Sequence, residues 1–452
     1  MKRLGYKAYI LVVLIGCFLL FAAMFVADED IVNELNNEIV QDEESLAVSL
    51  DSYLSKNFGF REELISLYAS IQTKFFKVSP VEDVIYGKDG YLFYKETVED
   101  YCGTNPVSER EVYNLYKTLE LMEEYVENQG GKFLFLVAPN KNSLYDYMPY
   151  NYGKIEGKSN WDRLENKLDS VAYVDAFSLF ESKDEELYYK TDTHWNDLGA
   201  YYVFEETMKV LEKEYDNRMQ YGYQEACSMV GDLQRMLYPT ARPNENQIVW
   251  DKPSTYEFLT KTRNFEQMYI ETYCEEAKGS ILMFRDSFAN NLIDHFGNTY
   301  EYGIYDKGSS YDFFQMSTYQ ADTVILEIAE RNLELVQKSM PQFFMPKRTS
   351  EEVFGDLAKV KNADGLATFI EAEKVGDAVC IQGCVTESYV KDDSNFFIKI
   401  NDLLYELTPQ TIQDSEYGFC GYVEVLNEPV SVELIVVTGD SIFTETIEVE
   451  IR

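Results

Sequence analysis

The chain has 452 residues, of which 46% are apolar, so it is long enough to form two or three domains with a sizeable core. Its formal net charge is −39, which excludes nucleic acid as a partner because the phosphates would be repelled. The seven cysteines show no paired CxxC spacing, and the chain has two histidines. We therefore expect no bound metal and no cofactor.

The N-terminus has the charge pattern of a membrane anchor. Lys2, Arg3 and Lys7 precede an uncharged apolar run over residues 8–26, and acidic residues follow at once. The run is long enough to cross a bilayer, and positive charge before it places the N-terminus in the cytoplasm. No small-residue cleavage site follows. We expect residues 1–27 to be an uncleaved transmembrane helix, and the rest of a single-pass cell-membrane protein to lie outside the cytoplasm.

One alternative concerns Cys17. The sequence Leu-Ile-Gly-Cys at 14–17 is similar to a bacterial lipoprotein box. A lipidated cysteine is normally followed by polar residues, whereas residues 18–21 continue the apolar run. The anchor is the interpretation that we carry forward.

The residues after the anchor change from helical spacing to short strands. Apolar residues at helical spacing, such as Leu46 and Leu50, predict a helical stalk over residues 28–80. A Lys-Asp-Gly turn at 88–90 between β-forming residues predicts a hairpin over 84–94.

From residue 108 the pattern alternates between helices and strands. Ser108 and Glu111 form a capping-box sequence at the start of one helix. Short, continuously apolar runs are typical of strands buried on both faces of a parallel sheet. We therefore predict an α/β domain over 81–350, with a parallel sheet flanked by helices. The expected strands are 132–138, 172–175, 280–284 and 323–328, and the expected helices are 108–129, 160–169 and 197–213. Residues 215–275 give no clear pattern.

The last hundred residues have a different pattern. Short alternating strands are separated by turn residues such as those at 401–402 and 439–440, and no helical spacing remains. This predicts a separate β-sandwich domain over 356–452. The expected strands are 378–384, 396–400, 403–407, 421–425, 430–437 and 444–451.

A candidate nucleophile follows one of the predicted buried strands. Ser287 lies between the strand 280–284 and a predicted helix over 288–295. Ligands of α/β folds bind at the carboxyl ends of parallel strands. The free N–H groups at the start of the next helix can hold an oxyanion. A serine in such a loop can also serve only as a helix N-cap.

A candidate base and its partner lie in a second segment. His194 can take a serine proton, and Asp192 can hold the other imidazole nitrogen. Residues two apart in an extended loop point to the same side, so one short segment can present both. His194 can instead cap the helix near Asn196, or belong to an Asp-x-His metal site, for which few other ligands are visible. His295 lies roughly 12 Å along the axis of the predicted helix from Ser287, too far to be its base.

Together these segments resemble the alginate O-acetyltransferase family of the AlgJ/AlgX type, whose core is an SGNH-hydrolase-like domain, and the related DHHW proteins of Gram-positive bacteria. The family's D-x-H-W segment matches 192–195, and its D-S-F segment matches 286–288. Further similar stretches are Phe60-Arg61 with the hairpin at 87–93, the proline loop at 137–145, and residues 327–332. The resemblance spans about residues 50–340 and does not reach the C-terminal β region.

The resemblance implies that Ser287, His194 and Asp192 form a catalytic triad. It also suggests further contacts: Asn140 in the proline loop can donate to the oxyanion, and Arg331 can line the site or form a structural salt bridge. Arg285 stands where SGNH enzymes usually carry glycine, a departure that affects the oxyanion geometry.

The expected function is an extracytoplasmic serine O-acetyltransferase that modifies a cell-surface or exopolysaccharide glycan through an acyl-serine intermediate. A surface polysaccharide is the expected acceptor, and in the family a membrane-bound O-acyltransferase often supplies the acyl group. One alternative is a carbohydrate esterase with the same triad, and another is a non-catalytic glycan-binding or cell-envelope scaffold protein. For the β region, carbohydrate binding and a spacer role both stay open.

Overall fold

A computed structural model describes residues 60–155, 157–261, 264–308, 310–355, 360–424 and 430–452. The expected transmembrane helix and most of the expected stalk lie outside these ranges. Among the residues that the structure describes, no helix is both long and apolar enough to cross a bilayer. The first described helix is α4 (Arg61–Ile71), which ends in a π-helical turn at Gln72–Phe76.

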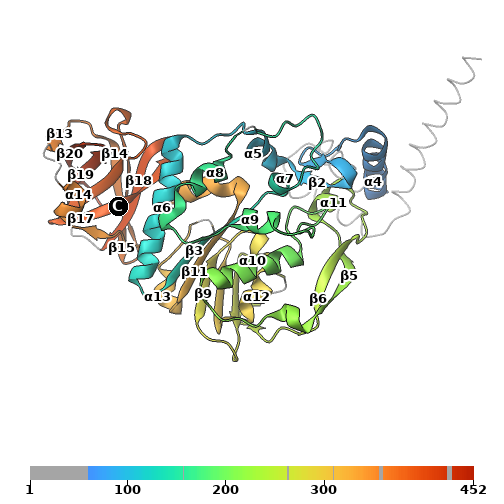
Figure 1. Cartoon of the computed structure of the whole chain (residues 1–452). Coiled ribbons are helices and arrows are strands. Elements are labelled where there is room, and N and C mark those ends of the chain that lie inside the picture. Colours follow the sequence, from blue (N-terminus) through green and yellow to red (C-terminus); the bar gives the residue numbers. More distant parts are fainter. Residues whose placement is uncertain (1–59, 156, 262–263, 309, 356–359, 425–429) are drawn as a thin grey trace, which may run out of the picture.

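A seven-stranded sheet forms the centre of the α/β region (Figure 1). The strands from β4 to β10 run parallel, as predicted, whereas β8 pairs antiparallel with both β10 and β7. In spatial order the strands are β4 (Tyr173–Val174), β3 (Lys132–Ala138), β11 (Thr323–Ala329), β9 (Ser280–Phe284), β10 (Tyr302–Asp306), β8 (Tyr269–Tyr273) and β7 (Glu257–Phe258). The four strands predicted for this domain are confirmed, and β7, β8 and β10 were not predicted.

Helices cover both faces of this sheet because successive side chains of a strand point to opposite faces. Phe133 and Phe135 of β3 pack in one core with α6 (Glu109–Asn128), α8 (Asn160–Glu165) and α13 (Gln315–Tyr319). The alternate residues Leu134 and Leu136 pack in a second core, on the other face. That core includes residues of α9 (Ala176–Glu181), α10 (Asp197–Val210) and α12 (Ile293–Gly297).

The predicted start of α6 is confirmed in detail. Ser108 Oγ accepts the backbone N–H of Glu111 at 3.0 Å, and the Glu111 carboxylate accepts the Ser108 N–H at 2.8 Å. This reciprocal pair satisfies two N–H groups that a helix start leaves free. Further short helices connect the larger elements: α5 (Val98–Cys102), α7 (Lys141–Leu144) and α14 (Ser350–Phe354).

Two hairpins and one helix lie beside the sheet. The predicted hairpin is confirmed as β1 (Val84–Tyr86) paired with β2 (Leu92–Tyr94). The unassigned stretch 215–275 contains a second hairpin, β5 (Tyr223–Met229) with β6 (Glu245–Trp250), and α11 (Asp232–Leu237) between its strands. Leu233 and Leu237 of α11 pack against Val84 and Leu92 of the first hairpin.

The C-terminal region forms one continuous nine-stranded sheet, where we predicted a two-sheet sandwich. The reason is β17, whose first half pairs with β16 and whose second half pairs with β18. The sheet curls until β14, at one end, contacts the chain just after β20, where Arg452 N donates to Ala372 O and Lys374 N donates to Arg452 O, both at 3.0 Å. The strands are β12 (Lys347–Arg348), β13 (Val360–Asn362), β14 (Ala367–Val375), β15 (Ala378–Val385), β16 (Asn395–Ile400), β17 (Leu403–Ile412), β18 (Ser415–Glu424), β19 (Val430–Thr438) and β20 (Ser441–Val449).

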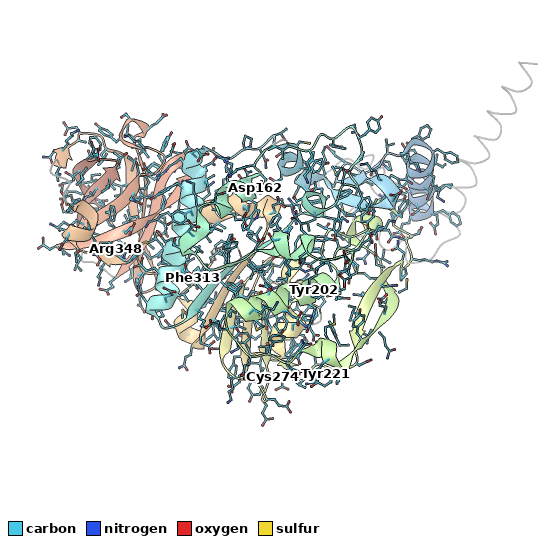
Figure 2. The ribbon with its side chains drawn as sticks, viewed as in Figure 1. Asp162, Tyr202, Tyr221, Cys274, Phe313 and Arg348 are labelled. Carbon is cyan, nitrogen blue, oxygen red and sulfur yellow. The ribbon has the colours of Figure 1, made fainter. Side chains whose placement is uncertain are left out.

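This curled sheet packs directly on α6, and both share one hydrophobic core. Buried Arg110 of α6 donates to Ser394 O at 2.7 Å. Lys117 pairs with Glu406 at 2.8 Å. Arg348 lies at the same junction, where its guanidinium binds the carboxylates of Glu124 and Glu406 (Figure 2). The two parts of the chain are therefore tightly joined.

Candidate active site

Ser287 lies just beyond the carboxyl end of β9, the central strand of the seven-stranded sheet. β9 ends at Phe284, a 3₁₀ turn covers Phe288–Asn291, and α12 begins at Ile293. The helix predicted over 288–295 is therefore two short pieces. This is the position at which α/β folds present ligands and reacting groups.

The carboxylate of Asp286 fixes the loop that carries Ser287. One of its oxygens accepts the N–H of Phe288 and the other accepts the N–H of Ala329, both at 2.8 Å. Its own N–H donates to Glu327 Oε2 at 2.9 Å. Burial raises the pKa of Glu327 well above its ordinary value. The side chain of Asp286 is thus occupied in joining this loop to the end of β11.

The loop that carries His194 is anchored independently. A bridge pairs Tyr188 with Trp195, and Tyr189 N donates to His194 O at 3.3 Å. Asn196 is the N-cap of α10, because its Oδ1 accepts the N–H of Gly199 at 2.9 Å. His194 therefore does not cap this helix, which rules out one of the alternatives for it.

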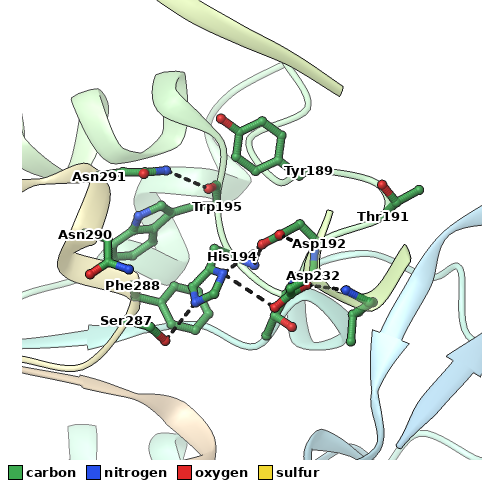
Figure 3. A network of polar contacts seen from close by, with 12 residues as sticks. Tyr189, Thr191, Asp192, His194, Trp195, Asp232, Ser287, Phe288, Asn290 and Asn291 are labelled. Carbon is green, nitrogen blue, oxygen red and sulfur yellow. Dashed lines mark hydrogen bonds and ion pairs between the residues drawn. The ribbon is translucent and has the colours of Figure 1, made fainter. Parts of the chain in front are cut away.

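The two loops meet with the three candidate side chains in hydrogen-bond contact (Figure 3). His194 Nε2 lies 2.8 Å from Ser287 Oγ, although the residues are 93 positions apart in the chain. His194 Nδ1 lies 2.7 Å from Asp192 Oδ1. The ring of Phe288 packs edge-on against the imidazole, with centroids 4.8 Å apart. A hydroxyl, an imidazole and a carboxylate are thus arranged in the order that activates a serine.

The charges of this group favour an ionised Asp192. Burial alone would raise its pKa, but the hydrogen bond and charge interaction with His194 outweigh it and hold the pKa at about 2. For His194, burial acts to lower the pKa, and Asp192, Asp232 and Asp286 together raise it above the ordinary value. The carboxylate therefore stabilises the imidazolium that forms when the serine proton is taken.

Asp232 is a second carboxylate beside the imidazole, and the sequence analysis missed it. Its Oδ2 lies 3.9 Å from His194 Nδ1. Its Oδ1 accepts the N–H of Thr193 at 2.8 Å, and its own N–H donates to Asp192 Oδ2 at 2.7 Å. Asp232 begins α11, in the stretch 215–275 that gave no pattern. Its sequence signal is weak, because a single aspartate in an unassigned stretch has no motif around it.

Lys141 binds the backbone of the loop that carries His194. Its ammonium donates to the carbonyls of Tyr189, Lys190 and Asp192 at 3.0, 3.2 and 2.6 Å. The side chain is 4% exposed, and burial lowers its pKa to about 8. Lys141 directly follows Asn140 in the proline loop, so this loop supports the histidine loop.

A small pocket adjoins the two loops and includes both Asn140 and Arg331. Its walls are Phe93, Tyr94, Thr97, Asn140, Lys141, Thr193, Phe288 and Arg331. Asn140 Nδ2 donates to Asp100 at 3.1 Å, and its buried Oδ1 has no partner in the described part of the chain. Because an amide nitrogen carries two N–H groups, Asn140 Nδ2 keeps a second N–H, and the oxyanion role suggested by the resemblance stays a prediction.

Arg331 also has a free donor in this pocket. Its buried Nη1 has no hydrogen-bond partner among the described residues. Its guanidinium lies over the rings of Tyr94 and Phe288, 5.5 and 5.6 Å from their centroids. Within the described ranges Arg331 forms no salt bridge. The structural salt bridge that the sequence analysis offered as an alternative is therefore not present among these residues.

The two remaining candidates point elsewhere. Arg285 donates to Asn290 Oδ1 at 2.7 Å and to the carbonyls of Phe265 and Gln267 at 2.9 and 2.7 Å, so its guanidinium braces a neighbouring loop. His295 is buried among the rings of Tyr201, Phe204 and Trp250. Burial lowers the pKa of His295 to about 4, and in the described structure it makes no hydrogen bond to Ser287.

Asp192, His194 and Asp232 also bring one potential ligand atom each within 4.8 Å of one another. In this arrangement His194 Nδ1 and both Asp192 oxygens already take part in the hydrogen bonds of the loop. A metal ion there would have to displace these contacts.

Comparison with known proteins supports the fold of the α/β region, which is that of an SGNH-hydrolase-like domain. Residues 84–292 match the family described as "SGNH hydrolase-like domain, acetyltransferase AlgX". This part of the chain is therefore similar to the SGNH-hydrolase-like acetyltransferase domain of the AlgX type.

Solved structures with a similar fold were also found. A DHHW family protein from Eubacterium siraeum is 16% identical, with a TM-score of 0.43, and the match covers 58% of this chain and all of that protein. Bacillus cereus PatB1 is 16% identical, with a TM-score of 0.44, over 55% of this chain and 96% of its own. The O-acetyltransferase domain of Pseudomonas putida AlgJ is 14% identical, with a TM-score of 0.38, over 56% and 92%. No curated protein matches the chain.

Proposed function

We propose that this protein is a serine O-acyltransferase that transfers an acetyl group to a hydroxyl of a cell-surface or exopolysaccharide glycan. The observation that carries the proposal is the 2.8 Å contact between His194 Nε2 and Ser287 Oγ, with Asp192 bound to the opposite imidazole nitrogen. The match of residues 84–292 to an acetyltransferase family supports acyl transfer as the reaction class.

In the first half-reaction His194 Nε2 takes the proton of Ser287 while Oγ attacks the carbonyl carbon of the acyl donor. The tetrahedral intermediate collapses, the bond to the donor's leaving group breaks, and His194 returns the proton to that group. An acyl-Ser287 ester remains. In the second half-reaction His194 takes the proton of the acceptor hydroxyl, whose oxygen attacks the ester. Ser287 leaves with the proton, and the acetylated glycan is released.

The negative oxygen of each intermediate needs donors near Ser287. The N–H of Phe288 is bound to Asp286, whereas the N–H of Ser287 has no acceptor among the described residues. The Nη1 group of Arg331 is also free, in the pocket that Phe288 lines. We assign the Ser287 N–H and the Arg331 guanidinium to this role. Arg285 braces a neighbouring loop, and Asn140 keeps one amide N–H on the wall of the same pocket.

The site is proposed to work outside the cytoplasm, on a protein held in the membrane by residues 1–27. The charge pattern around the apolar run at 8–26 supports this orientation. The acceptor would be a surface polysaccharide, and a membrane-bound O-acyltransferase would deliver the acyl group. No cofactor enters the proposed reaction.

Release of p-nitrophenol from its acetate ester tests the nucleophile in the purified full-length protein. We expect Ser287→Ala to abolish the release, while Ser228→Ala, an exposed serine on β5, leaves it unchanged. The peptide that contains Ser287 should gain the mass of one acetyl group when the reaction is quenched in acid. Activity that survives Ser287→Ala would remove this residue from the mechanism.

Adding a glycan acceptor then separates transfer from hydrolysis. For a transferase, acetylated oligosaccharide should form at the expense of free acetate. If acetate remains the sole product with every acceptor offered, the same three residues belong to an esterase. A wild-type protein that never acquires the acetyl group would instead support a non-catalytic scaffold.

A further inference from the structure

We infer that Asp232 is a positioning residue for His194, which fixes the backbone beside it and adds a second carboxylate next to its imidazole. The inference rests on the proposed function, in which His194 is the base. Nothing in the sequence pattern singles out Asp232, because it lies in the one long stretch to which no element was assigned.

The geometry shows a direct connection between α11 and the histidine loop. Asp232 accepts from Thr193 N and donates its own N–H to Asp192, so it contacts the residue before His194 and the carboxylate that orients it. Thr191 O accepts the N–H of Gln234 at 3.0 Å. Glycine is required at 231, since a Cβ there would lie 2.2 Å from Thr191 O. The start of α11 is thus packed tightly against the loop.

The charge of Asp232 acts on the same imidazole. Its Oδ2 lies 3.9 Å from His194 Nδ1, too far for a hydrogen bond but close enough for a charge interaction. Both carboxylates stabilise the protonated imidazole, and Asp192 has the stronger effect on the pKa of His194. Asp192 therefore orients the ring, and Asp232 adds charge without competing for Nδ1.

Other charged groups around His194 must be separated from this effect. They come from four elements: Asp192 on the loop itself, Asp286 after β9, Lys141 on α7, and Arg331 after β11. Glu245 of β6 is also near and accepts from Thr191 N at 2.6 Å, but it is not among the main causes of the raised pKa of His194. Glu245→Gln is therefore a matched control, because it neutralises a carboxylate that holds the same loop.

Histidine NMR tests the inference directly because the chain has only two histidines. With ¹³C-labelled imidazole rings in the full-length protein, His194 should titrate above the ordinary pKa of histidine, and His295 at about 4. In Asp232→Asn the retained amide oxygen can still accept from Thr193 N. We expect the His194 midpoint to fall by roughly one pH unit. Glu245→Gln should leave it in place.

The low midpoint of His295 reports in the same spectra whether each variant is folded. If Asp232→Asn unfolds, Asp232→Ser replaces it, because serine also removes the charge and keeps a hydrogen-bonding side chain in the first turn of α11. The acidic limb of kcat/KM for p-nitrophenyl acetate should move to lower pH by the same amount. A folded variant with an unmoved His194 midpoint, or a shift no larger than that of Glu245→Gln, overturns the inference. Failure of the proposed function would instead show as activity in Ser287→Ala, independently of the NMR titration.

Discussion

One oxygen of Asp192 binds His194 twice: Oδ1 accepts the ring Nδ1–H at 2.7 Å and the backbone N–H at 3.0 Å. The carboxylate therefore fixes both the main chain and the ring. It also selects the tautomer in which Nδ1 carries the proton, so that Nε2 is free to accept the proton of Ser287. Because the two residues are separated by one position, this arrangement is built into a single extended segment.

Asp192→Asn should reduce kcat for ester hydrolysis by roughly 10²–10⁴-fold. An asparagine can present its NH₂ group to Nδ1 and so favour the wrong tautomer, and it removes the charge that stabilises the imidazolium. The measurement is the steady-state rate on p-nitrophenyl acetate, with circular dichroism to show that the variant is folded. A folded variant with nearly full activity would contradict the role of Asp192.

The rate should depend on pH through His194. The base acts when its imidazole is neutral, and the neighbouring carboxylates raise its pKa above the ordinary value of about 6.5. We expect kcat/KM to be low in acid and to rise about tenfold per pH unit. The midpoint of this rise should lie above pH 6.5, and the rate should level off at higher pH. A profile that is already flat at pH 6 would show that the free enzyme does not depend on this group.

Arg331→Met should separate catalysis from stability. Nη1 has no hydrogen-bond partner in the described part of the structure. The substitution therefore loses only the contacts with the two aromatic rings, and the free energy of unfolding should fall by about 1 kcal/mol or less. If the guanidinium holds the oxyanion, kcat should fall by roughly 10²-fold or more while KM changes little. The alternative, a structural arginine, would lower the melting temperature and leave kcat unchanged.

Sequence patterns predicted the parts of this fold that depend on local chemistry. Continuously apolar runs identified β3, β9 and β11, and the Ser108–Glu111 pair identified the start of α6. Ser287 was found because it follows a predicted buried strand. His194 was found because Asp192 lies two residues before it in the same short segment. That the two segments lie in contact required the structure.

Other parts could not be predicted because they depend on distant pairing. β7 at the edge of the sheet has two residues, β8 is only alternately buried, and β10 contains Gly303 and ends at Asp306, so none has a continuous apolar run like that of β3. The strands of the C-terminal region were largely predicted, but their closure through Ala372 and Arg452 joins residues 80 positions apart in the chain. Asp232 was missed because its role comes from where α11 packs.

Lys141→Met is expected to destabilise the protein and its active site together. The change leaves the buried carbonyls of Tyr189 and Asp192 without a donor, whereas Lys190 O keeps the N–H of Leu92 at 3.0 Å. Unsatisfied buried acceptors cost roughly 1–3 kcal/mol each, so the free energy of unfolding should fall by about 2–4 kcal/mol after local relaxation. Chemical denaturation measures this. Lys88→Met, on an exposed lysine, is the control and should have little effect.

The junction between α6 and the C-terminal sheet should make the described structure unfold as one unit. Apolar residues of α6 and of β16 to β19 belong to the same core, and polar contacts such as Thr118 Oγ1 to Pro409 O cross the junction. Removing residues 356–452 would expose the face of α6 that this core covers, and a large exposed apolar face favours aggregation. We expect a chain that ends at residue 350 to be insoluble or to melt far below the full-length protein.

Calorimetry of the full-length protein gives the complementary measurement. One cooperative transition is expected, and Arg110→Ala should shift that whole transition to lower temperature, because it removes a buried donor from Ser394 O and an aromatic contact with Phe396. Two well-separated transitions, with Arg110→Ala moving only one of them, would show that the β region folds independently. In that case it would be a separate domain, as the sequence first indicated.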